Sequence, residues 1–184
     1  YAYYSGNNCL TYEKKEIENK VYILNVFCPI DFWLSNISNL TLETFVKEIL
    51  SLIISFSVGI FIITYLFNLP SKITGDYDIV YEYYIKNFIK SIPADLFFVF
   101  VYFVIAGIFM KFFNLKSDID KLMTVALTTI ILTGLACYYF KSNKLTDSFF
   151  SRWFHSVGYS SIIYDVLLLV FIYACFLFIK RKIQ

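Results

Sequence analysis

Two aspartates, Asp95 and Asp165, lie inside long runs of apolar residues, where chemistry by a carboxylate would have to take place within a membrane. Asp165 carries the sole formal charge in residues 156–179, a stretch of 24 residues. A carboxylate at membrane depth is costly unless it faces protein, water or a partner charge, and such residues often mark proton or ion paths. The sequence therefore predicts that Asp165 points inward, toward neighbouring helices.

Other polar residues extend this pair into a candidate intramembrane polar network. Its members are Asp165, Asp95, His155, Arg152 and Tyr164. If successive helices alternate in direction, the second and fourth apolar runs start on the same side, which brings both aspartates to one end of the fold. Three uses remain open. Asp165 either accepts hydrogen bonds from hydroxyl groups or pairs with His155 or Arg152; or Arg152, Trp153 and His155 line a site for a lipid headgroup or partner subunit; or both aspartates form a proton or ion path.

The sequence offers little support for an enzyme or a bound cofactor. His155 is the sole histidine, and no Ser-His-Asp spacing, glycine-rich phosphate loop or H-E-x-x-H motif is present. The four cysteines contain no C-x-x-C pair, so zinc, haem and iron–sulfur centres lack a ligand set. A formal charge of +2 is too small to indicate nucleic-acid binding. We expect no catalytic residue, no metal and no cofactor.

The elements that must position these residues are membrane-spanning helices. Hydrophobic residues make up 59% of the 184-residue chain, against about 45–50% in soluble domains. Four nearly uncharged runs are each close to the ~20 residues that cross a bilayer. They predict an all-α four-transmembrane-helix bundle in a membrane domain over residues 46–182. The expected spans are 49–69, 92–110, 122–140 and 157–179.

Two further patterns refine this architecture. Residues 77–90 alternate apolar and charged faces with helical spacing, which predicts an amphipathic interfacial helix, with Glu82 and Lys86 as an i,i+4 pair. In the first span, Ser51, Ser55 and Gly59 recur every four residues and form a stripe on which another helix can pack closely. Packing within the bundle is the simpler use of this stripe, and a dimer seam is the alternative.

Residues 1–45 form a polar segment, which we expect to be a small N-terminal ectodomain. Residues 9–12 and 21–27 resemble strands, and a β-hairpin between them would bring Cys9 close to Cys28. In an oxidising compartment the two thiols could form a disulfide, which the chain-entropy model values at ~3 kcal/mol for a loop of this size. Two unrelated free thiols are the alternative.

A resemblance appears at the start of the last apolar run. The residues Phe149-Phe-Ser-Arg-Trp-Phe-His155, followed by Gly158-Tyr159 and Tyr164-Asp165, resemble the end of small multi-span membrane proteins of large nucleocytoplasmic DNA viruses, the giant viruses. The similarity covers residues 92–179. It implies an inner-membrane component of the virion in contact with the minor capsid layer, and it carries over no catalytic residue. The N-terminal segment lies outside it.

Together these patterns predict a non-enzymatic structural protein of a membrane. Its expected partners are the lipid bilayer and other membrane or capsid subunits, with no nucleic acid. The expected location is the virion inner membrane. Two alternatives stay open, because the composition also suits an accessory subunit of a protist respiratory complex in the mitochondrial inner membrane, or a small transporter or proton-conducting subunit that uses Asp165 and Asp95.

Overall fold

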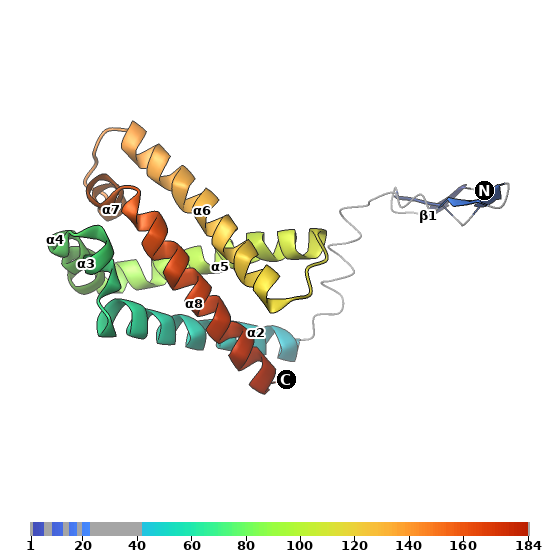
Figure 1. The fold of residues 1–184 in the computed structure, drawn as a ribbon, viewed down its shortest axis with the longest axis horizontal. Helices are drawn as coiled ribbons and strands as arrows, with labels where there is room; N and C mark the ends of the chain where they lie inside the picture. The colour runs from blue at the N-terminus through green and yellow to red at the C-terminus, as the bar shows by residue number, and fades with distance from the viewer. Residues whose placement is uncertain (1, 6–8, 13–14, 18–19, 23–41, 184) are drawn as a thin grey trace. The chain divides into compact units, whose positions relative to one another are not determined.

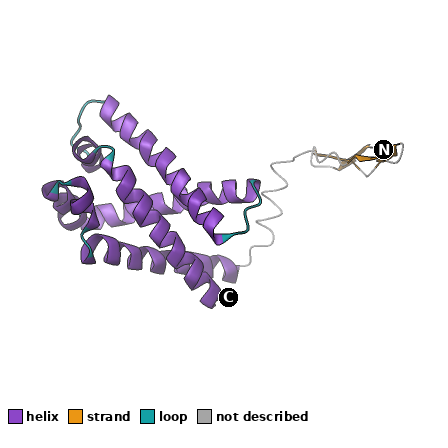
Figure 2. Cartoon of the chain, in the orientation of Figure 1, coloured by secondary structure: helices purple, strands orange, loops and turns teal. Residues whose placement is uncertain are grey.

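The computed structural model describes residues 2–5, 9–12, 15–17, 20–22 and 42–183 of the chain. The chain divides into two compact units, residues 1–45 and residues 46–184, and the second is here called the helical unit. The helices are α2 (Leu42–Gly59), η1 (Ile60–Leu66), α3 (Leu69–Thr74), α4 (Tyr77–Tyr81), η2 (Glu82–Lys86), α5 (Phe88–Phe112), α6 (Asp118–Ser142), α7 (Phe149–Val157) and α8 (Ser160–Ile183), where η marks π-helix (Figures 1 and 2).

The described residues of the first unit include four short strands in two antiparallel pairs. Strand β1 (Ala2–Ser5) pairs with β2 (Cys9–Tyr12), and β3 (Lys15–Ile17) pairs with β4 (Lys20–Tyr22). The hairpin predicted from residues 9–12 and 21–27 extends past residue 22, and Cys28 also lies outside the described residues. The predicted Cys9–Cys28 disulfide therefore stays a prediction.

Four helices of the described chain are long and apolar enough to cross a membrane, and they cover residues 45–66, 88–112, 118–142 and 160–182. At a rise of ~1.5 Å per residue, each is about as long as the ~30 Å hydrocarbon core is thick. They overlap the four predicted spans, and each of their ends differs from the predicted one by two to four residues. The helical architecture and its compatibility with a multi-pass membrane protein follow from these helices.

Local backbone chemistry sets where these helices begin and end. Asn68 adopts a left-handed conformation with φ of 47°, and Pro70 follows in the first turn of α3, so the helix that precedes them cannot continue. Gly158 has φ of 59°, a region that residues with a Cβ rarely adopt, and it separates α7 from α8. The predicted fourth span began at residue 157. In the structure α8 instead begins at Ser160, and residue 157 is the last residue of the separate helix α7.

The predicted interfacial helix over residues 77–90 differs most from the structure. It consists of α4 and the π-helical segment η2, and residues 88–90 belong to α5. The wider π turn shifts the helical phase, so that Tyr83 and Tyr84 are both buried while Ile85 is half exposed. Ile89, whose spacing places it on the apolar face of the predicted helix, is 85% exposed. A period of 3.6 residues cannot predict a face that crosses a π segment.

Helix α8 contacts α3, α6 and α7 and contributes several of the most deeply buried side chains, such as Ile172 and Tyr164 (Figure 1). The small-residue stripe of α2 is buried as well, with Ser51 at 1% and Ser55 at 0% exposure. A Cβ at Gly59 would overlap the side chain of Ile172. The stripe therefore lies inside the helical unit, where Gly59 allows α2 to approach α8.

Candidate functional site

Asp165 lies one and a half turns inside α8 and is held by α6. Its Oδ2 accepts a hydrogen bond from Thr133 Oγ1 at 2.9 Å, and the same threonine oxygen lies 3.2 Å from the Tyr102 hydroxyl of α5. Thr133 is fully buried. Three helices that could each span a membrane therefore meet through one hydroxyl, one phenol and one carboxylate, and Asp165 faces its neighbouring helices.

Asp95 lies two turns inside α5 and is held by η2. Tyr83 donates its hydroxyl to Asp95 Oδ1 over 2.6 Å. Burial, together with the nearby Asp95 charge, raises the pKa of Tyr83 well above its ordinary value, so Tyr83 keeps its proton and remains a donor. The second oxygen, Asp95 Oδ2, is buried and has no hydrogen-bond partner among the described residues. An acceptor left in that state costs about 1–3 kcal/mol.

Tyr164 is the polar centre of the helical unit. Its hydroxyl lies 2.9 Å from Thr64 Oγ1 in η1 and 2.9 Å from the Tyr84 hydroxyl in η2, and the Tyr164 side chain is 1% exposed. Burial raises the pKa of Tyr84 well above its ordinary value, so the Tyr84 hydroxyl keeps its proton. A hydroxyl can both donate and accept a hydrogen bond, so these three hydroxyls join the first and fourth long helices to η2 without a charged group.

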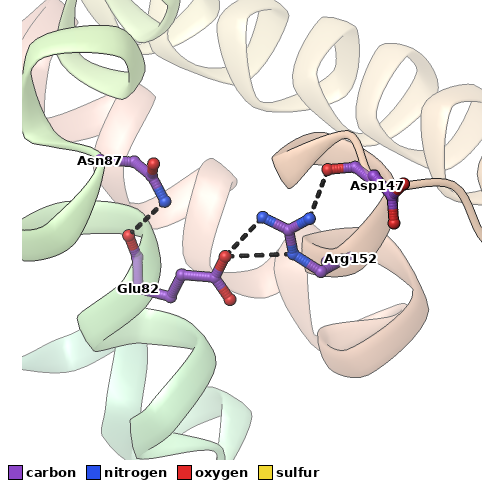
Figure 3. A network of polar contacts seen from close by, with 4 residues as sticks. All are labelled: Glu82, Asn87, Asp147 and Arg152. Carbon is purple, nitrogen blue, oxygen red and sulfur yellow. Dashed lines mark hydrogen bonds and ion pairs between the residues drawn. The ribbon is translucent and has the colours of Figure 1, made fainter.

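Arg152 does not pair with Asp165, in contrast to one of the predicted alternatives. Its Nη2 and Nε lie 2.5 Å and 3.1 Å from Glu82 Oε1, and its Nη1 donates to the Asp147 backbone carbonyl (Figure 3). Glu82 thus pairs with Arg152 rather than in the predicted i,i+4 pair with Lys86. Asn87 Nδ2 donates to the Glu82 carbonyl at 2.9 Å, so the arginine joins α7 to the η2–α5 junction.

His155 likewise is not joined to the aspartates. It is partly buried in α7, and its Nε2 has no hydrogen-bond partner in the part of the chain that the structure describes. The structure therefore divides the predicted network in two. Tyr164, which is buried, and Asp165 and Asp95, which are partly buried, belong to a set of hydroxyls and carboxylates, whereas Arg152 belongs to an ion pair with Glu82.

A cavity of about 190 Å³ brings the two aspartates together. It lies between α5, α6, α7, α8 and η2, and eight of its fourteen lining residues are aromatic. Both Asp95 and Asp165 line it, and none of the fourteen residues is lysine, arginine or histidine. The predicted meeting of the two aspartates at one end of the fold thus takes the form of an aromatic cavity with two carboxylates.

The sequence did not identify the residues that hold the aspartates. Neither Thr133 nor Tyr83 belongs to the polar network predicted from the sequence, which expected only that hydroxyl groups could bond to Asp165. A signal did exist, because buried polar groups need partners and hydroxyls are the common ones inside a membrane helix unit. Choosing among sixteen tyrosines and several threonines requires the helix crossings.

No group of three or more potential metal ligands comes together within the residues described by the structure. Comparison with protein-family models, with curated proteins and with solved structures found no match to the chain.

Proposed function

We propose that the chain is a non-enzymatic, multi-pass membrane protein that serves as a structural subunit of a larger membrane assembly. In this proposal the four long helices form a bundle, the helices α3, α4, η2 and α7 lie at one membrane surface, and residues 1–45 form an ectodomain. Support comes from the way polar groups at membrane depth are used. Asp165 and Tyr164 bond to other helices of the same chain, which is what a scaffold requires.

The outward face of α5 is the observation that carries the proposal of a partner. Of the most apolar stretch of α5, 11% is buried, whereas the corresponding figure for the first long helix is 44%. Phe97, Phe100, Val104 and Ile108 recur at helical spacing on that face and are between 41% and 61% exposed. Aromatic side chains are enriched at protein interfaces, and a helix of another subunit would bury this face.

Native electrophoresis in a mild detergent tests the proposal. We expect the full-length chain to migrate in a complex larger than its own 21.6 kDa plus detergent, together with a second protein. The double variant Phe97→Leu with Phe100→Leu keeps the face apolar for lipid but removes the aromatic shape. It should release the chain from the complex.

A matched control alters another exposed face. Leu127 and Ile131 of α6 are each 57% exposed, and changing both to valine also removes volume from an apolar surface. This control should leave the complex intact. The proposal fails if the wild-type chain migrates alone in mild detergent, or if both double variants behave alike.

The location of the assembly remains part of the proposal. The resemblance of residues 92–179 to giant-virus membrane proteins supports the virion inner membrane, with the minor capsid layer as a source of partners. A respiratory complex in a mitochondrial inner membrane is the alternative. Identification by mass spectrometry of the proteins that migrate with the chain distinguishes capsid proteins from respiratory subunits.

A transporter or proton-conducting subunit is the second candidate, because Asp95 and Asp165 line the same cavity. Purified chain in proteoliposomes would then carry a proton or cation flux that Asp165→Asn abolishes while the helices remain folded. A wild-type chain with no flux above empty liposomes, together with the complex described above, favours the scaffold.

A further inference from the structure

We propose that the cavity between α5, α6, α7, α8 and η2 binds a small primary ammonium cation, supplied either by a free amine or by the headgroup of a phosphatidylethanolamine lipid. The proposal is independent of the structural role argued above, since a scaffold can hold partners with the cavity empty or filled. The proposal rests on the size of the cavity, on the aromatic residues of its walls and on its two carboxyl groups.

The size of the cavity suits a ligand slightly larger than benzene. Its volume is about 190 Å³, and an apolar cavity of ~150 Å³ in another protein binds benzene. Pockets for drug-sized molecules begin near ~300 Å³. A ligand with one ring or a short alkyl chain, plus a single polar group, therefore matches the available space.

The walls of the cavity favour an organic cation over a neutral molecule or a metal ion. Phe98, Phe140, Phe150, Trp153 and Phe154 present aromatic rings to it. The faces of aromatic rings attract cations, and the attraction grows when water is excluded. Calcium and magnesium instead need about six oxygen ligands, which a wall of phenylalanines does not supply.

Two carboxyl groups, those of Asp95 and Asp165, line the cavity, and none of its other lining residues is basic. Lysine, arginine and histidine are missing from the fourteen residues that line it. Asp165 Oδ2 is bonded to Thr133, and Asp95 Oδ1 to Tyr83, but Asp95 Oδ2 is buried and unpartnered among the described residues. A primary ammonium group has three N–H donors and one positive charge, so it would supply the missing donor to Asp95 Oδ2 and a counter-ion for the carboxylate that it contacts.

Two short segments supply five of the residues that line the cavity. Phe150, Trp153 and Phe154 come from α7, and Tyr83 and Tyr84 come from η2. The Arg152–Glu82 ion pair joins these same two segments (Figure 3). The aromatic walls are thus held together by a charged contact outside the cavity, which leaves the carboxylates inside it available to a ligand.

Calorimetric titration of the full-length chain in detergent at neutral pH tests the proposal. The probe is benzylammonium, the protonated form of benzylamine, and benzyl alcohol is its neutral counterpart of nearly equal size. We expect benzylammonium to bind about tenfold or more tightly than benzyl alcohol, because the alcohol offers no charge to the two carboxylates. Equal affinity for both probes would show an apolar cavity and overturn the proposal.

Three variants locate the site. Asp95→Asn should weaken benzylammonium binding about tenfold to a hundredfold, the range expected for one hydrogen bond to a charged group. Asp120→Asn removes the same charge from an exposed position in the first turn of α6 and should leave binding unchanged. Ala136→Leu fills the cavity without altering any charge, and it should abolish binding even if Asp95→Asn fails to fold.

Competition experiments with short-chain lipids distinguish the two sources of the ammonium group. Short-chain phosphatidylethanolamine should compete with benzylammonium if the natural ligand is a headgroup, and it should not compete if a free amine is the ligand. Short-chain phosphatidylglycerol, which has no ammonium group, should not compete in either case. Binding that survives Ala136→Leu, or that folded Asp95→Asn leaves unchanged, contradicts the proposal.

Discussion

Substitution of Tyr164 by phenylalanine isolates the contribution of the buried hydroxyl chain to stability. The change keeps the ring, which is 1% exposed, and removes the hydroxyl that lies 2.9 Å from both Thr64 and Tyr84. Hydrogen bonds between membrane helices contribute ~0.6 kcal/mol on average and up to ~1.7 kcal/mol. Loss of two bonds, with no water to replace them, should therefore lower the free energy of unfolding by about 1–3 kcal/mol.

Titration with SDS, followed by far-UV circular dichroism, measures this free energy in mixed micelles. Tyr159→Phe is the control, because it deletes the same hydroxyl from a side chain that is 57% exposed. The double variant Tyr84→Phe with Tyr164→Phe should lose less than the sum of the two single losses, since both remove the same bond. If Tyr164→Phe is as stable as Tyr159→Phe, the hydroxyl chain does not hold the helices together.

Two further perturbations have signs fixed by the structure. Gly59→Ala should destabilise the helical unit by about 1–3 kcal/mol, because the new methyl group overlaps the buried Ile172 side chain; Gly107→Ala, which meets open space, should be neutral or stabilising, and equal effects in SDS unfolding would contradict the packing. The hydrogen bond from Ser156 lowers the pKa of Asp76 below its ordinary value of 3.8. The bond therefore contributes to the stability of the folded state above pH 3.8, and this contribution is lost as the pH falls through the lowered pKa of the folded state. Ser156→Ala should therefore be less stable than wild type at neutral pH and equal to it in strong acid, whereas a difference that persists in acid would rule out this contact as the cause.

The existence of the four long helices could be predicted because each depends on local composition. An uncharged run of about twenty residues can satisfy its backbone within a membrane as a helix, whatever surrounds it. Asp165 also revealed the inward side of α8, since an ionised group at that depth needs a neighbour. Each of these inferences depends on the sequence of a single segment.

The partners of the aspartates could not be predicted, because they depend on how helices cross. Thr133 meets Asp165 through the packing of α6 on α8, and Tyr83 reaches Asp95 because a π turn rotates it inward. Arg152 looked available to Asp165 from its position in the sequence. The break at Gly158 turns α7 aside and directs the arginine to Glu82 instead.

Cross-linking between α6 and α8 in native membranes tests the central claim, that the carboxylate of the last long helix faces its neighbours. The pair Thr133→Cys with Asp165→Cys replaces two side chains whose polar atoms are 2.9 Å apart, and a short bifunctional thiol reagent should join them in a product identified by mass spectrometry. The outward pair Leu135→Cys with Leu167→Cys, at residues 60% and 46% exposed, should remain unjoined under the same conditions. The contrary result has three parts: the outward pair is joined, position 165 is not linked to position 133, and position 165 reacts with lipid-soluble reagents. That result would place Asp165 toward lipid and contradict the account.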